Sequence, residues 1–82
     1  MIGSKEVDEY YKSAFETCRK EVEETLAVSH NDIVGKTYDR LLQKGYPSER
    51  AIDAISEIYA SFRTEAFMFG RTFSIEDNLN RL

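Results

Sequence analysis

Apolar residues recur every three or four positions along most of this chain, and the longest such stretch runs from Ala51 to Phe73. Six of its apolar residues share one helical face: Ile55, Ile58, Phe62, Ala66, Phe69 and Phe73. From Ala66 to Phe69 the sequence is apolar on every side, which indicates burial from more than one direction. The pattern predicts a helix of about 22 residues, roughly 33 Å long.

The same period predicts a first helix over residues 5–28 and a shorter second helix over 32–44. The apolar stripe of the first helix comprises Val7, Tyr11, Ala14, Phe15, Cys18, Val22 and Leu26. Residues 1–4 are expected to form a disordered lead, with Ser4 as the N-cap of the first helix. Ser29 or Asn31 is expected to cap the second helix, with Asp32 in its first turn.

The sharpest boundary in the sequence is Gly45-Tyr46-Pro47. Gly45 supplies a left-handed residue after the last helical turn, and Pro47 prevents the helix from continuing. Ser48 is expected to cap the third helix, over 49–70, and Gly70 to end or bend it. Ser74 is expected to cap a short fourth helix over 75–81.

These elements predict one all-α domain over residues 1–82, since strand-like alternation is absent. We expect a three-helix up-down-up bundle with two long outer helices, a shorter middle helix and a short C-terminal fourth helix.

The middle helix is too short to cover both long ones, so two apolar half-helices are expected to project at opposite ends. These apolar surfaces could be buried in three ways: in a two-fold homodimer, by a last segment that bends at Gly70 and folds back on its own chain, or by another protein. The expected partner interface consists of Tyr10, Tyr11, Phe15, Phe62, Phe67, Met68, Phe69 and Phe73.

The composition limits the partners and the cellular compartment expected for this protein. The net charge is -4 with a pI near 4.9, which argues against nucleic acid and anionic lipid as partners. The single cysteine, Cys18, excludes an internal disulfide and fits a reducing compartment. Neither a signal peptide nor an apolar run of about 20 residues is visible, so a soluble cytoplasmic protein is expected.

The sequence offers little for catalysis. Cys18 lies on an apolar stripe, where a small hydrophobic core residue is expected, and His30 lies in a turn. Glu23, Glu24, His30 and Asp32 lack metal-ligand spacing, and no phosphate loop or serine elbow occurs. We therefore expect no enzyme, no cofactor and no metal.

Residues 32–70 also have the outline of a helix-turn-helix. The cations that would then contact nucleic acid are Lys36, Arg40, Lys44 and Arg50. Glu49 and Asp53 at the start of the third helix would face phosphates, which argues against this alternative.

The segment from Gly45 to Ile55 resembles the first turn and second helix of ubiquitin-associated domains, which have a Gly-aromatic turn followed by an Ala-x-x-Ala-hydrophobic helix. Such a domain would break soon after Ile55, whereas here the apolar period continues to Phe69. We therefore attribute the likeness to the turn that both sequence patterns favour, and we carry over no binding residues.

The expected function is a non-enzymatic protein–protein interaction module, an adaptor or inhibitor of a larger complex. Phage- and mobile-element-encoded inhibitors, including anti-defence proteins, are often this small and acidic, which is an analogy of type. A second expected docking surface is the acidic face of Glu16, Glu21, Glu23 and Glu24. The alternatives are a dimeric helix-turn-helix-like DNA-binding regulator and a binder of small ligands at a subunit interface.

Overall fold

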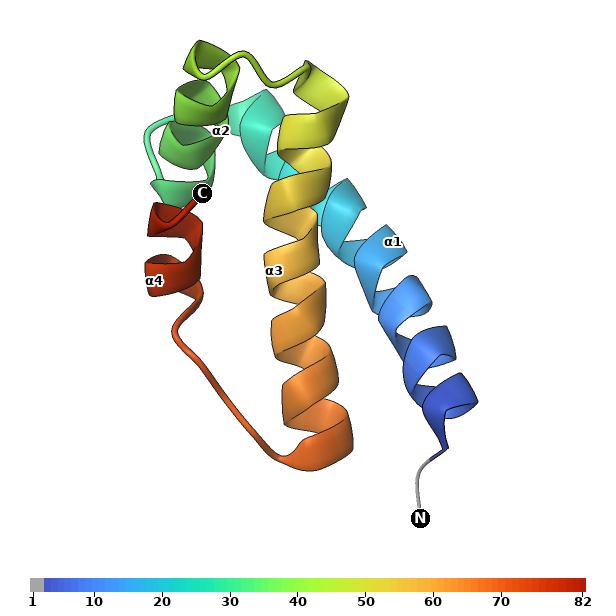
Figure 1. Cartoon of the computed structure of the whole chain (residues 1–82). Helices are drawn as coiled ribbons and strands as arrows, with labels where there is room; N and C mark the ends of the chain where they lie inside the picture. The colour runs from blue at the N-terminus through green and yellow to red at the C-terminus, as the bar shows by residue number, and fades with distance from the viewer. Residues whose placement is uncertain (1–2) are drawn as a thin grey trace.

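The computed structural model describes residues 3–82, which form four α-helices. They are α1 (Ser4–Val28), α2 (Ile33–Gln43), α3 (Ser48–Phe69) and α4 (Ile75–Asn80). No strand occurs in the described range. The all-α fold class is confirmed, with two long helices, a shorter one between them in the chain and a short fourth (Figure 1).

The two long helices, α1 and α3, lie side by side and run in opposite directions. Tyr10, early in α1, stacks on Phe67 near the end of α3, with 4.7 Å between ring centroids. Further along α1, Arg19 donates hydrogen bonds to Asp53 and Glu49 near the start of α3. The relative direction of these helices thus differs from the up-down-up order, in which they would be parallel. Opposite directions allow the two longest apolar stripes to bury each other, which the short α2 could not do.

The two apolar half-helices lie at the same end of the molecule, so the expectation that they project at opposite ends is wrong. In the lower half of Figure 1, the first half of α1 lies beside the second half of α3. After Gly70 the chain turns back along α3, and Phe73 packs edge-on against Phe62 with 5.5 Å between ring centroids. The last segment therefore folds back on its own chain, which is one of the three expected ways of burying the apolar surface.

The main core lies where the four helices meet. Six buried side chains form it: Val22, Val34, Leu41, Ala51, Ile55 and Leu79. A second, smaller cluster joins α1 and α3 further toward the free end and contains Ala14, Cys18 and Ala60. The buried residues of α1 stand four positions apart, which confirms the apolar stripe predicted for this helix.

The starts of α1 and α3 differ from the predicted ones. Gly3, not Ser4, is the N-cap of α1, and Ser4 is already helical. The other residues of the predicted lead, Met1 and Ile2, lie outside the described range. Pro47, not Ser48, is the N-cap of α3, and the Ser48 hydroxyl lies 2.7 Å from the Tyr38 hydroxyl of α2. The serine thus links two helices instead of capping one.

The start of α2 also differs from expectation, whereas that of α4 is confirmed. Asp32 caps α2 by accepting a hydrogen bond from the Gly35 N–H at 2.9 Å. Ser29 is instead the C-cap of α1, and its hydroxyl accepts from the Asn31 N–H at 3.1 Å, so neither of the two expected residues caps α2. A carboxylate also interacts favourably with the positive end of the helix dipole. Ser74 caps α4 as predicted, since its hydroxyl accepts from the backbone N–H three residues later.

The turn between α2 and α3 has the predicted ending. Gly45 is left-handed, with φ 98°, and its N–H bonds to the Leu42 carbonyl. The Tyr46 N–H bonds to the Leu41 carbonyl at 3.1 Å, which completes a Schellman motif. Gly70, with φ 63°, ends α3 in a second left-handed residue.

Gly35 fixes how closely α2 approaches the preceding turn. A Cβ added to Gly35 would lie 2.2 Å from the His30 Cα, and backbone atoms of His30 surround the site. The turn between α1 and α2 therefore has its present form only because this residue has no side chain.

We expect Gly35→Ala to lower the free energy of unfolding by more than about 2 kcal/mol, because the new methyl overlaps backbone that cannot move freely. Urea denaturation followed by circular dichroism measures the loss. Gly3→Ala is the matched control, because nothing lies within 4 Å of its added Cβ. Its cost is limited to the weaker capping by alanine, below about 1 kcal/mol. Equal losses in the two variants would contradict this account of Gly35.

Candidate functional site

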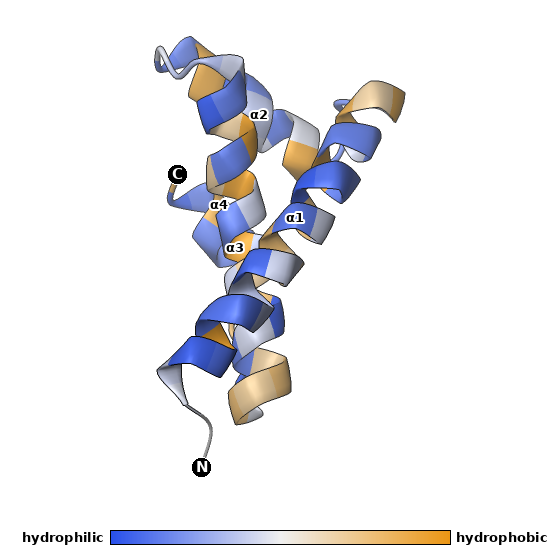
Figure 2. Cartoon of the chain, turned by 90° about the vertical axis from the view of Figure 1, so that its right-hand side faces the viewer, coloured by the Kyte–Doolittle hydropathy of each residue, from blue (hydrophilic) through white to orange (hydrophobic). Residues whose placement is uncertain are grey.

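The most exposed aromatic side chains of the described residues lie at the free end of the α1–α3 pair. Phe67 is 72% exposed and Phe69 is 45% exposed, both in the last turn of α3. Figure 2 shows the same feature as hydrophobic colour at the lower end of α3, beside a largely hydrophilic α1. We call Tyr10, Phe67 and Phe69 the aromatic tip.

Contacts within the chain hold the aromatic tip in place. The Tyr10 and Phe67 rings are parallel to within 2°, so one face of Phe67 is covered and the rest faces solvent. The Arg71 guanidinium lies 4.8 Å from the centre of the Phe69 ring, a cation–π contact. Arg71 is itself held by Glu65 at 2.8 Å. The tip therefore presents two phenylalanines in defined orientations.

Sequence reasoning identified the aromatic members of the tip and missed the pair that supports Phe69. Glu65 and Arg71 stand six residues apart, and the left-handed Gly70 between them redirects the chain. No helical spacing rule finds such a pair, because its geometry depends on how the helix ends.

The other aromatic residues of the predicted interface are mostly occupied within the chain. Tyr11 and Phe15 pack around the small cluster of Ala14, Cys18 and Ala60. Phe62 and Phe73 pack on each other, and Met68 is half-buried. The structure thus divides the predicted set into an internal part and the exposed aromatic tip.

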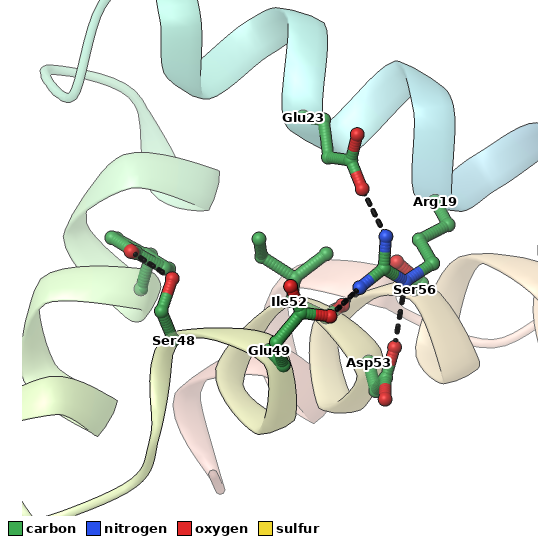
Figure 3. Close-up of polar contacts among 8 residues, drawn as sticks. Arg19, Glu23, Ser48, Glu49, Ile52, Asp53 and Ser56 are labelled. Atoms are coloured by element: carbon green, nitrogen blue, oxygen red, sulfur yellow. Dashed lines mark hydrogen bonds and ion pairs between the residues drawn. The ribbon is translucent and has the colours of Figure 1, made fainter.

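The predicted acidic face is partly neutralised. Glu21 accepts from Arg63 of α3 at 2.8 Å, and Glu23 pairs with Arg19 on its own helix. Figure 3 shows Arg19 also directed at the two carboxylates of α3. The hydrogen bond that Arg19 donates to the Asp53 carboxylate is the largest cause of the raised pKa of Arg19. Glu16 and Glu24 remain exposed, separated by about 12 Å along the helix.

The predicted nucleic-acid face is divided in the same way. Arg40 donates to the Leu79 carbonyl at 2.7 Å, and Lys44 donates to the Leu82 backbone oxygen at 2.8 Å. These two side chains donate to backbone oxygens at the C-terminal end of α4, where positive charge interacts favourably with the helix dipole. Lys36 and Arg50 remain exposed. Two of the four cations, Arg40 and Lys44, thus hold α4 and are less available to contact phosphates, which disfavours the DNA-binding alternative.

The Cys–His pair considered for catalysis is not assembled. Cys18 is 1% exposed between α1 and α3, and the charges that affect its pKa are those of Arg63 and Glu21. His30 lies in the turn before α2, with its Nδ1 3.0 Å from Asp39 and its ring edge-on to Tyr38. Each side chain therefore has a structural role where the structure places it.

We expect Arg40→Gln to lower the free energy of unfolding by about 1–2 kcal/mol, because two charge-assisted bonds to carbonyl oxygens are lost. Hydrogen exchange should show faster opening of α4 in this variant, since a six-residue helix is unstable alone. Lys36→Gln removes an exposed charge from the same helix face and should change stability by less than about 0.5 kcal/mol. Unchanged exchange in α4 of Arg40→Gln would show that Arg40 does not hold this helix.

Burial raises the pKa of the Cys18 thiol, an effect that the Arg63 charge opposes and the Glu21 charge reinforces. Folding therefore favours the protonated thiol. The stability that the raised thiol pKa contributes is fully present below the unfolded-state pKa of about 8.5. It is lost as the pH rises through the folded-state pKa. At pH 8 we expect a thiol reagent such as Ellman's reagent to react at least about 100-fold more slowly with the native chain than with the chain in urea. Similar rates would mean that Cys18 is accessible in the folded protein.

No family model, curated protein or solved structure matches this chain. None of the helices in the described range combines the length and apolar content needed to cross a membrane. Within residues 3–82, no group of three His, Cys, Asp or Glu side chains is arranged to hold a metal ion. The candidate site is therefore defined by its geometry, and the feature that stands out is the aromatic tip.

Proposed function

We propose that this chain is a non-enzymatic protein–protein interaction module, an adaptor or inhibitor that docks on a larger protein through the aromatic tip. The observation that carries the proposal is the joint exposure of Phe67 and Phe69 on one helix end. The two side chains stand two positions apart in the last turn of α3, so they project from different sides of one helix end, and exposed aromatic surface of this kind is typical of docking sites. The small size and acidic charge agree with the analogy to phage and mobile-element inhibitors, and a cytoplasmic location belongs to the same proposal.

The energetics of the tip favour docking into a pocket of a partner. Complete burial of a fully exposed phenylalanine side chain contributes about 1.5–3 kcal/mol. Phe67 and Phe69 are 72% and 45% exposed, so burial of their remaining surface supplies part of a micromolar affinity. The stacking of Tyr10 on Phe67 and the cation–π contact to Phe69 restrict both rings before binding. Less conformational entropy is then lost when the complex forms.

A second copy of the chain is the competing occupant of the tip. A homodimer would bury the exposed phenylalanines against their counterparts around a two-fold axis. Light scattering at high micromolar concentration separates the two cases. A dimer that dissociates on Phe67→Ser would favour self-association, whereas a monomer under these conditions leaves the tip free for another protein.

We expect Phe67→Ser to abolish retention of the partner by the tagged chain in lysate from its native host, as measured by quantitative mass spectrometry. The matched control is Val28→Ser, because Val28 is a large apolar residue that is 87% exposed at the other end of α1. Both variants should keep the helical content and unfold within about 1 kcal/mol of the parent, because little buried surface is lost. A partner set that is the same for Phe67→Ser and for the parent chain would overturn the proposal.

A further inference from the structure

A shallow groove runs along α3 beside its contact with α1, since Asp53 in its lining accepts a hydrogen bond from Arg19 of α1. Two hollows of about 250 and 260 Å³ share Ala54 and Glu57, so they form one continuous groove. Its lining on α3 includes Ala54, Glu57 and Ser61, and one wall comes from Phe73, Asn78 and Leu82. In Figure 1 the segment that follows α3 turns back, and both this segment and α4 lie alongside α3.

The length of the groove suits a short α-helix. Its lining on α3 extends from Arg50 to Ser61, which corresponds to about 17 Å or three helical turns. The small side chains of Ala54 and Ser61 stand two turns apart and permit close approach of a second helix. An extended peptide would find no strand edge here, and its backbone N–H and C=O groups would lose water without gaining partners. A helix satisfies these groups internally.

The charge in the middle of the groove specifies one side chain of the occupant. Glu57 is exposed and makes no ion pair with any residue in the described range, although Arg50 lines the same hollow. The neighbouring carboxylate of Asp53 is held by Arg19. The field of Glu57 reaches the groove margin: the pKa of the Tyr11 phenol is raised first by burial and next by this carboxylate. A cation placed opposite Glu57 by an incoming helix would form a partly desolvated ion pair.

We propose that this groove binds an amphipathic α-helix of a partner protein that has apolar residues three and four positions apart and a Lys or Arg opposite Glu57. This surface is separate from the aromatic tip, because neither Phe67 nor Phe69 lines it. A chain with two such surfaces can bridge two proteins. The groove proposal does not require that the tip bind anything.

Selection of a displayed random-peptide library on the full chain tests the groove, with the Glu57→Lys variant as the counter-selection target. We expect the recovered peptides to be amphipathic helices with one central Lys or Arg. In fluorescence anisotropy, a labelled selected peptide should bind Glu57→Lys at least about tenfold more weakly than the parent chain. Exchange of its central cation for Glu should restore binding to that variant.

Two controls separate the groove from other surfaces. Glu24→Lys makes the same charge change at an exposed glutamate of α1 and should alter the affinity by less than about twofold. Phe67→Ser should leave it equally unchanged, so that failure of the tip and failure of the groove are distinguishable. The groove proposal is overturned if no peptide of this pattern is recovered, if Glu57→Lys binds the peptide as the parent does, or if the charge exchange gives no rescue.

Discussion

The antiparallel packing of α1 on α3 is the interaction on which the rest of the molecule depends. Each is more than 20 residues long, and neither could bury its apolar stripe against the 11-residue α2. Cys18 and Ala60 meet in the contact between them, where small side chains allow close approach. Arg19 and Arg63 add ion pairs that cross from one helix to the other. α2 and α4 then complete the core at one end only.

The position of the aromatic tip follows from that arrangement. Because α2 and α4 cover one end, the other end consists of two helices and the segment that leaves α3 (Figure 1). A pair of helices cannot enclose aromatic residues that point in several directions from one of them. Tyr10 covers one face of Phe67, Phe73 covers Phe62, and the remaining surface stays exposed. The exposed phenylalanines are thus a geometrical consequence of unequal helix lengths, and a binding partner would bury them.

Several charges that resemble a binding surface in the sequence are structural. Arg40 and Lys44 hold the end of α4, and Arg19 and Arg63 neutralise glutamates of the predicted acidic face. Surface ion pairs of this kind contribute little stability individually, but they remove charge from the surface that a partner meets. Glu57 differs because it makes no ion pair in the described range, although Arg50 lines the same hollow. The contacts that each charge makes, more than the number of charges, show which charges are structural.

The sequence by itself determined the four helices, their approximate limits and the turn at Gly45, because these follow from local periodicity and backbone preference. It also identified Phe67 and Phe69 as candidates for exposure. Only the tertiary structure decided that α1 and α3 are antiparallel and that Arg40 secures α4. These features depend on contacts between residues distant in the chain, such as Tyr10 with Phe67 and Arg40 with Leu79. Local pattern cannot specify them, because the same amphipathic helices can bury their stripes in more than one order.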